Sequence, residues 1–410
     1  MGDATSAPLR GTRRRLEHID AMRPVKQAAV ISTHTLVFFA PLATSSAVVG
    51  VIMLTRFSRD AFLFVSACML AYSYRDVERI DFRSYFKRRF MSVGVPYLAW
   101  TVIYFFYTSL NPTNSFPFYS LAWVKVFSHS GAHYFIHLLL TGYYHLYYLI
   151  VIMEFYVLFP LLFKFVRKYS SWHWLFIVVA LVWQIAYGAL VDSRHLFIHL
   201  SGVQQTRFIT SYPIYLVGGV IVALHLDDIH QWIVQHARLI IAVTVVSGVG
   251  AEILSFLGRY SWMPLFLQTG TFVFSPTVVP FDISAILCVY LLGVFLVSKN
   301  RSVRTRAAVQ SGSDNSYGVY LSQMLWIPLL LRFRDHFHIH LAWELQVPIA
   351  LVVVYSLGFL FTAVVARTPL AVAVTGRSRA TWASLFPRRH DTPDQLRGDV
   401  GDGPFDVVYE

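Results

Sequence analysis

The chain has 410 residues, of which 56% are hydrophobic and only 14% are charged, and its formal net charge is +12. Soluble globular chains carry about 25% charged residues, so this chain has too few polar residues to coat a soluble surface of its size. The composition excludes an ordinary soluble enzyme. It also argues against a nucleic-acid-binding protein, because a basic domain of that kind keeps a polar surface. The natural class is a polytopic helical membrane protein.

Apolar runs bounded by charged residues predict about ten transmembrane helices of about 20 residues each. In chain order, the expected spans are 24–43, 55–74, 91–108, 144–163, 173–191, 212–226, 239–257, 277–297, 317–331 and 346–366. The second run is the least regular, since Arg56, Arg59 and Asp60 interrupt it. We therefore expect an all-α transmembrane bundle.

The distribution of positive charge predicts the orientation of this bundle. Most of the 34 Lys and Arg residues fall in segments that share one side if the N-terminus is cytoplasmic. The positive-inside rule then places both termini in the cytoplasm. We divide the chain into a basic N-terminal segment (1–23), a membrane domain (24–366) and a tail (367–410). Clusters of Pro, Gly and Asp in the tail predict disorder.

Ionisable side chains inside a span are costly and usually face a cavity or a partner. His34 lies about 15 Å along the first span, and Glu154 lies about as deep in a span that enters from the opposite face. A carboxylate that accepts a hydrogen bond from one imidazole nitrogen fixes the tautomer of the ring. Such a pair suits a general base for a hydroxyl nucleophile. The alternative is that each group bonds only to a neighbouring helix.

Two basic features lie at the expected cytoplasmic face. Arg23 opens the span of His34, about 16 Å before it along the helix. It would either hold a phosphate-bearing cofactor or act as an ordinary positive-inside anchor. Arg88 and Arg89 end a basic cluster that would bind phosphates or the head groups of anionic membrane lipids.

Near the outer end of the second span, Arg59 and Asp60 are adjacent. They form either an ion pair that lines an outward cavity or a part of the loop. Histidines recur at helical spacing at His129, His133 and His137. Because no acidic or Cys partner accompanies them in a recognised pattern, we expect no metal site.

Five short segments, taken in order and spacing, carry a family resemblance. They are Ile19–Arg23 followed after ten residues by His34, Phe62–Ala67, Phe86–Arg89 with Pro96–Tyr97, His145–Leu149 with Glu154 and Tyr156, and Ser316–Leu321. Together they resemble the acyltransferase-3 family, multispanning membrane acyltransferases of the O-antigen acetylase and nodulation-protein type. The resemblance covers roughly residues 16–366. Ala67 and Gln323 depart from it, since many members have Gly and His there.

The resemblance implies transfer of an acyl group, acetyl by default, from cytoplasmic acyl-CoA. The acceptor is a hydroxyl of an extracytoplasmic sugar, glycolipid or cell-surface glycan, which places the protein in the plasma (inner) membrane. On this interpretation His34 is the catalytic base, Arg23 supports the acyl-CoA site, and Arg88 and Arg89 bind the CoA phosphates. Our own inference from depth adds Glu154, as a group that orients His34 or binds the acceptor. The candidates for acceptor binding are Arg59, Asp60, His145 and Tyr156.

Two other functions fit the same residues. Intramembrane His, Glu and Arg are equally natural in a proton-coupled transporter or flippase for a glycolipid. The absence of paired broken helices or inverted halves in the sequence counts against it. A non-catalytic membrane scaffold would tolerate the loss of Arg23 and His34 together.

Overall fold

The computed structural model describes residues 16–41, 46–109, 126–192, 207–257, 276–298 and 301–380. Within these ranges, all regular secondary structure is helical, which confirms the expected all-α class. Residues 1–15 and 381–410 lie outside the described ranges, so the cytoplasmic location of the termini stays a prediction.

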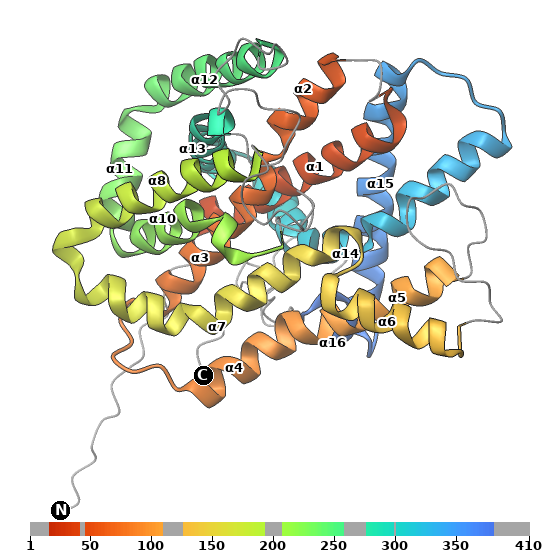
Figure 1. The fold of residues 1–410 in the computed structure, drawn as a ribbon, viewed down its shortest axis with the longest axis horizontal. Coiled ribbons are helices and arrows are strands. Elements are labelled where there is room, and N and C mark those ends of the chain that lie inside the picture. Colours follow the sequence, from red (N-terminus) through yellow and green to blue (C-terminus); the bar gives the residue numbers. More distant parts are fainter. Residues whose placement is uncertain are drawn as a thin grey trace, which may run out of the picture.

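The helices form one bundle (Figure 1). The α-helices are α1 (Glu17–Phe39), α2 (Ser46–Thr55), α3 (Phe57–Tyr74), α4 (Phe82–Arg89), α5 (Val95–Ser109), α6 (His129–Thr141), α7 (Tyr147–Lys168), α8 (His173–Asp192), α10 (Pro213–Leu224), α11 (Leu226–Gln235), α12 (Ala237–Leu257), α13 (Val279–Leu296), α14 (Val303–His336), α15 (Trp343–Val365) and α16 (Ala371–Thr375). A π-helical turn, η1 (Phe90–Gly94), joins α4 to α5, and short 3₁₀ turns precede α7, α8, α10 and α13.

Several described helical segments are long and apolar enough to cross a membrane, which supports a multi-pass membrane protein. There are six of them: Phe82–Ser109, Tyr144–Lys168, Ser170–Ala189, Ala237–Leu254, Pro276–Leu296 and Trp343–Val365. α10 and α11 meet the same criterion only as a pair, bent by 102°. Six, or seven with the bent pair, is fewer than the expected ten.

Three expected spans, on α1, α3 and α14, are missing from this set because these helices carry many polar residues. On α1, the side chains of Arg23 and Gln27 are buried, and Gln323 on α14 is fully buried. α1 packs against α3, α13, α14 and α15 and lies near the middle of the view in Figure 1. The polar side chains therefore face neighbouring helices, as expected for functional groups inside a membrane bundle.

α3 and α10 approach each other closely through small residues. A Cβ added at Gly219 of α10 would lie 2.6 Å from the carbonyl oxygen of Phe64 and 2.9 Å from the Cβ of Ala67. Small residues let two membrane helices bring their backbones together. The close contact near Ala67 is thus supplied by a glycine on the partner helix.

The segment after α15 packs against the bundle. The indole nitrogen of Trp100 donates a hydrogen bond to the carbonyl oxygen of Val374 (2.9 Å), and the Arg377 guanidinium lies 3.1 Å from the Asp314 carboxylate. The expected tail boundary at residue 367 therefore precedes packed residues that continue to residue 380.

Candidate active site

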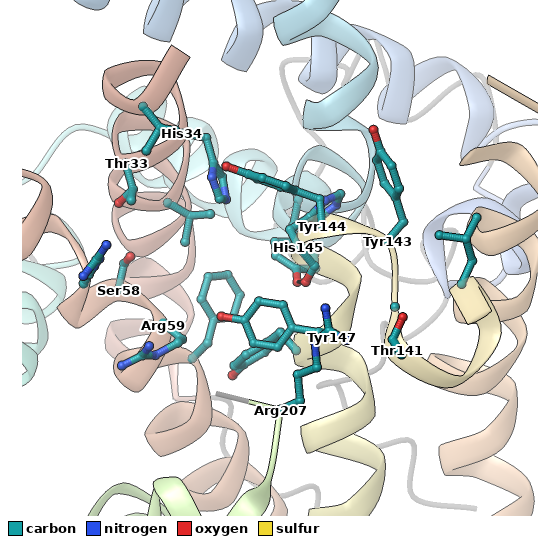
Figure 2. A pocket seen from close by; sticks show the side chains of 18 of the residues that line it. Thr33, His34, Ser58, Arg59, Thr141, Tyr143, Tyr144, His145, Tyr147 and Arg207 are labelled. Carbon is teal, nitrogen blue, oxygen red and sulfur yellow. Dashed lines mark hydrogen bonds between the residues drawn. The ribbon is translucent and has the colours of Figure 1, made fainter. Parts of the chain in front are cut away.

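A cavity of about 480 Å³ lies between α1, α3, α6 and α7. Figure 2 shows the side chains that point into it. Among the described residues, its charged and imidazole side chains are His34, Arg56, Arg59, His137, His145 and Arg207. Its other polar and aromatic side chains are Thr33, Ser58, Phe62, Tyr134, Thr141, Tyr143, Tyr144, Tyr147, Tyr148 and Tyr320.

One face of α1 connects this cavity to the other end of the bundle. Arg23, Gln27, Val30 and His34 follow one another at intervals of three or four residues, so they share a face of the helix. Val30 and His34 line the cavity. Arg23 is 2% exposed and forms an ion pair with Asp20 (3.3 Å). At 1.5 Å per residue, about 16 Å separates Arg23 from His34 along the axis.

His34 faces the cavity instead of bonding to a neighbouring helix. Its Nδ1 atom is buried and has no hydrogen-bond partner among the described residues. Its ring lies 5.1 Å from the ring of Tyr144 and 6.4 Å from that of His145, measured between centroids. The Arg56 guanidinium is close enough to interact with it electrostatically. This environment leaves the Nδ1 atom of His34 without a hydrogen bond to any described residue, at the wall of the cavity.

A tight turn before α7 brings Tyr143, Tyr144 and His145 to the cavity together. Gly142 has φ = 72° and Tyr144 has φ = 39°, and a positive φ at a residue other than glycine is uncommon. Such strained residues concentrate at active and binding sites. The Tyr320 hydroxyl donates a hydrogen bond to the main-chain oxygen of His145 (2.5 Å), which helps to hold the turn.

Glu154 lies outside the cavity, so the contact with His34 expected from their matched depth is not formed. Its Oε2 atom instead accepts a hydrogen bond from the main-chain nitrogen of Ile209 (2.9 Å). Depth fixes the height of a residue on its helix but not the direction of its side chain. Tyr144 and His145, at the start of the same span, have rings that face His34 instead.

The segment that carries Arg207 is fixed by three side chains. Besides Glu154, the indole nitrogen of Trp183 donates to the main-chain oxygen of Thr210 (2.8 Å). The side-chain amide of Gln184 donates a hydrogen bond to the main-chain oxygen of Ser211 (2.9 Å). Sequence reasoning gave no role to Arg207, because a single arginine in an outer loop carries no pattern.

Arg59 and Asp60 form an ion pair, as in the first of the two alternatives above. Arg59 Nε lies 3.0 Å from Asp60 Oδ1, and Arg59 lines the cavity while Asp60 does not. Asp60 also interacts with Asp282 of α13. Asp282 accepts a hydrogen bond from the Tyr215 hydroxyl (3.3 Å).

Arg23 and Arg89 come together through Tyr156, away from the cavity. The Arg89 guanidinium lies 5.6 Å from the centre of the Tyr156 ring, and Arg23 interacts with the same tyrosine electrostatically. Arg88 donates a hydrogen bond from Nη2 to the Tyr74 hydroxyl (3.2 Å). Tyr156 thus lies beside Arg23 and Arg89, and it does not line the cavity of His34, where Arg59 and His145 lie.

Lys26 and Phe62 lie between these two groups. Lys26 is 1% exposed, and its ammonium nitrogen lies 3.7 Å from the centre of the Phe62 ring, a cation–π contact. Phe62 in turn lines the cavity of His34. The contact of Lys26 with Phe62 therefore joins the buried face of α1 to the cavity wall on α3.

This arrangement has the chemical groups needed to activate a hydroxyl. A neutral imidazole accepts the proton of an attacking hydroxyl, and nearby guanidinium and hydroxyl donors stabilise an oxygen that becomes negative. Among the described residues, no cluster of three or more His, Cys, Asp or Glu side chains is arranged to hold a metal ion.

Comparison with known protein families identifies the family of the chain. A family model described as an acyltransferase domain, that of the acyltransferase-3 group, matches residues 17–367. The match spans the helix of Arg23 and His34 and every described element that lines the cavity. No curated protein and no solved structure matches the chain. The chain belongs to the acyltransferase-3 family.

Proposed function

We propose that the protein is an acyl-CoA-dependent O-acyltransferase of the plasma membrane. It moves an acyl group, acetyl by default, from cytoplasmic acyl-CoA to a hydroxyl of an extracytoplasmic sugar, glycolipid or cell-surface glycan. The observation that carries the proposal is the position of His34. It faces the cavity, and its Nδ1 atom has no hydrogen-bond partner in the described part of the chain. The same helix carries Arg23, eleven residues earlier.

In this reaction, His34 removes the proton of the acceptor hydroxyl as its oxygen attacks the thioester carbonyl carbon. The new C–O bond forms, the C–S bond breaks, and the proton passes from the imidazolium to the CoA thiolate. Negative charge develops on the carbonyl oxygen before the C–S bond breaks. Arg56 and His145 supply donors for it from the cavity wall.

The donor occupies the opposite end of the site. Arg23, Arg88 and Arg89 hold the phosphates of CoA, as guanidinium groups do in many phosphate sites. The acyl-bearing arm then extends along the face of α1 to His34, over about 16 Å. The charged part of CoA thereby stays at the cytoplasmic face, while the acyl group reaches an acceptor at the outer side.

The test is acyl-CoA turnover by the purified protein in detergent, with membrane glycolipid extract as the acceptor. His34→Ala should abolish both release of CoA and acylation of the acceptor, while His133→Ala, at an exposed position on α6, should leave both unchanged. Thermal unfolding of each variant verifies that it is folded. An active His34→Ala protein contradicts the role of His34. A folded wild-type protein that turns over no acyl-CoA contradicts the enzymatic function and leaves the transporter and the scaffold as alternatives.

A further inference from the structure

The cavity around His34 is lined by positive side chains and, within the described part of the chain, by no carboxylate. Arg56, Arg59 and Arg207 all contribute to its wall, and no Asp or Glu does so among the described residues. A neutral sugar has no need of three guanidinium groups. Arginine inside a protein is most often used to bind carboxylate or phosphate, which it contacts with two parallel hydrogen bonds.

The acidic residues behind the wall do not cancel this charge. Asp60 is paired with Arg59, and Asp282 interacts with Asp60 and with Arg56. Three guanidinium groups therefore face two carboxyl groups, and carboxyl groups in contact are not both ionised without cost. The cavity keeps a net positive charge within the described part of the chain.

Arg207 holds the most distinctive position of the three. Its Nε atom is buried and has no hydrogen-bond partner among the described residues. The chain just after it is fixed by Glu154, Trp183 and Gln184. These hydrogen bonds hold the backbone beside Arg207 in place, and a fixed backbone limits how far a ligand-binding side chain can move.

We infer that the acceptor is anionic, and that Arg207 binds a phosphate or carboxylate on the molecule whose hydroxyl is acylated at His34. The inference rests on the proposed function, since His34 marks the reacting hydroxyl. In Figure 2, Arg59 and Arg207 lie on one side of the cavity, and the rings of His34, Tyr144 and His145 lie on the other. The anionic group and the reacting hydroxyl thus occupy opposite sides of one bound acceptor.

A binding experiment separates this inference from the proposed function. The purified full chain is titrated by calorimetry with three glycosides that share an octyl chain: octyl glucoside, octyl glucuronide and octyl glucoside 6-phosphate. A maltoside detergent with a longer chain keeps the protein soluble. The carboxylate and phosphate arms distinguish the two sources of negative charge. We expect at least one anionic glycoside to bind tenfold or more tightly than the neutral one, and its affinity to fall as salt rises.

The variants locate the anion. Arg207→Gln should weaken binding of the anionic glycoside by roughly ten- to a hundredfold, which is the effect of losing one hydrogen bond to a charged group. It should leave the neutral glycoside unchanged. The affinity of Arg207→Lys for the anionic glycoside should lie between those of wild type and Arg207→Gln, because lysine keeps the charge but lacks the planar guanidinium. Arg332→Gln, at an exposed position on α14 outside the cavity, is the matched control and should bind like wild type.

Three results would overturn the inference. One is no detectable preference for either anionic glycoside over the neutral one. Another is an Arg207→Gln protein that keeps the preference. The last is loss of binding of 3′,5′-ADP, the nucleotide part of CoA, in Arg207→Gln, which would assign this arginine to the donor. None of these readouts needs turnover, so an inactive protein that binds the anionic glycoside through Arg207 would contradict only the proposed function.

Discussion

The imidazole rings of His34 and His145 face one cavity with their centroids 6.4 Å apart and their planes inclined by 63°. This separation is too long for a direct hydrogen bond between the rings and short enough for one bridging oxygen atom. One ring comes from the interior of α1 and the other from the turn before α7. The two imidazoles thus suit different oxygens of one reaction, the attacking hydroxyl and the thioester carbonyl.

Replacing His145 tests this division of roles. His145→Phe keeps an aromatic ring against Tyr104 and Tyr320 but removes both nitrogen atoms. We expect kcat to fall by about 10²–10³, the loss typical of one donor to a developing oxyanion, with little change in the KM for acyl-CoA. His137→Phe, at the rim of the same cavity and at an exposed position on α6, is the control and should keep most of its activity. Equal losses in the two variants would contradict a specific role for His145.

Gly142 controls the turn that delivers Tyr144 and His145. Its φ of 72° is readily adopted only by glycine, and a Cβ there would also clash with the main-chain nitrogen of Tyr147. Gly142→Ala should therefore shift the turn and lower kcat by at least tenfold. It should also lower the unfolding temperature. Gly250→Ala on α12, where an added Cβ meets nothing within 4 Å, should change neither quantity. An unaltered rate in Gly142→Ala would show that the turn geometry is not required.

The relative positions of Arg23 and His34 could be predicted from the sequence because both residues lie on one helix. Arg23 and His34 lie on a single regular element, so spacing alone sets their separation and their shared face. The pairing of His34 with Glu154 failed for the opposite reason. It joined two helices by depth, and the rotation of α7 depends on packing that cannot be read from residue spacing alone.

Other features depended on tertiary contacts. Tyr144 points into the cavity through an unusual backbone conformation, and Arg207 is placed by side chains of α7 and α8. Hydropathy alone does not identify α1 and α14 as spans, because it treats buried Arg23 and Gln323 as exposed polar residues, although both are enclosed by neighbouring helices. The expected count of ten spans stays a prediction. Helices that carry the polar site are therefore the ones that composition identifies least well.

Glu154 is expected to be a positioning residue for the segment of Arg207. Glu154→Gln keeps a side-chain oxygen that accepts the hydrogen bond from the Ile209 nitrogen, whereas Glu154→Ala removes it. We expect Glu154→Ala to raise the acceptor KM several-fold with a smaller effect on kcat, and Glu154→Gln to restore most of the affinity. Steady-state kinetics at varied acceptor concentration measure both. If Gln and Ala lowered kcat equally and left KM unchanged, Glu154 would have an acid–base role that needs its charge.

Arg89 is expected to act on the donor. It is buried at the arginine cluster with Tyr156, whereas Arg83 on the same helix is exposed. Arg89→Gln should raise the KM for acyl-CoA by about tenfold or more, because a charge-assisted contact to a phosphate is lost. The KM for the acceptor should stay within twofold. Arg83→Gln is the matched control for the loss of one positive charge from α4, and an equal effect there would reduce the role of Arg89 to a general surface potential.

The two carboxyl groups behind the cavity are expected to substitute for each other as partners of Arg59. Asp60 pairs with Arg59 directly, and Asp282 interacts with both. Asp60→Asn and Asp282→Asn should each destabilise the protein only modestly, since one carboxylate remains to pair with the guanidinium. The double variant leaves a largely buried cation without a carboxylate, which costs about 3–5 kcal/mol. Asp335→Asn, which breaks an exposed ion pair with Arg334, should cost less than about 1 kcal/mol. Unfolding in mixed detergent micelles measures all four, and an additive double variant would show that the two carboxylates act independently.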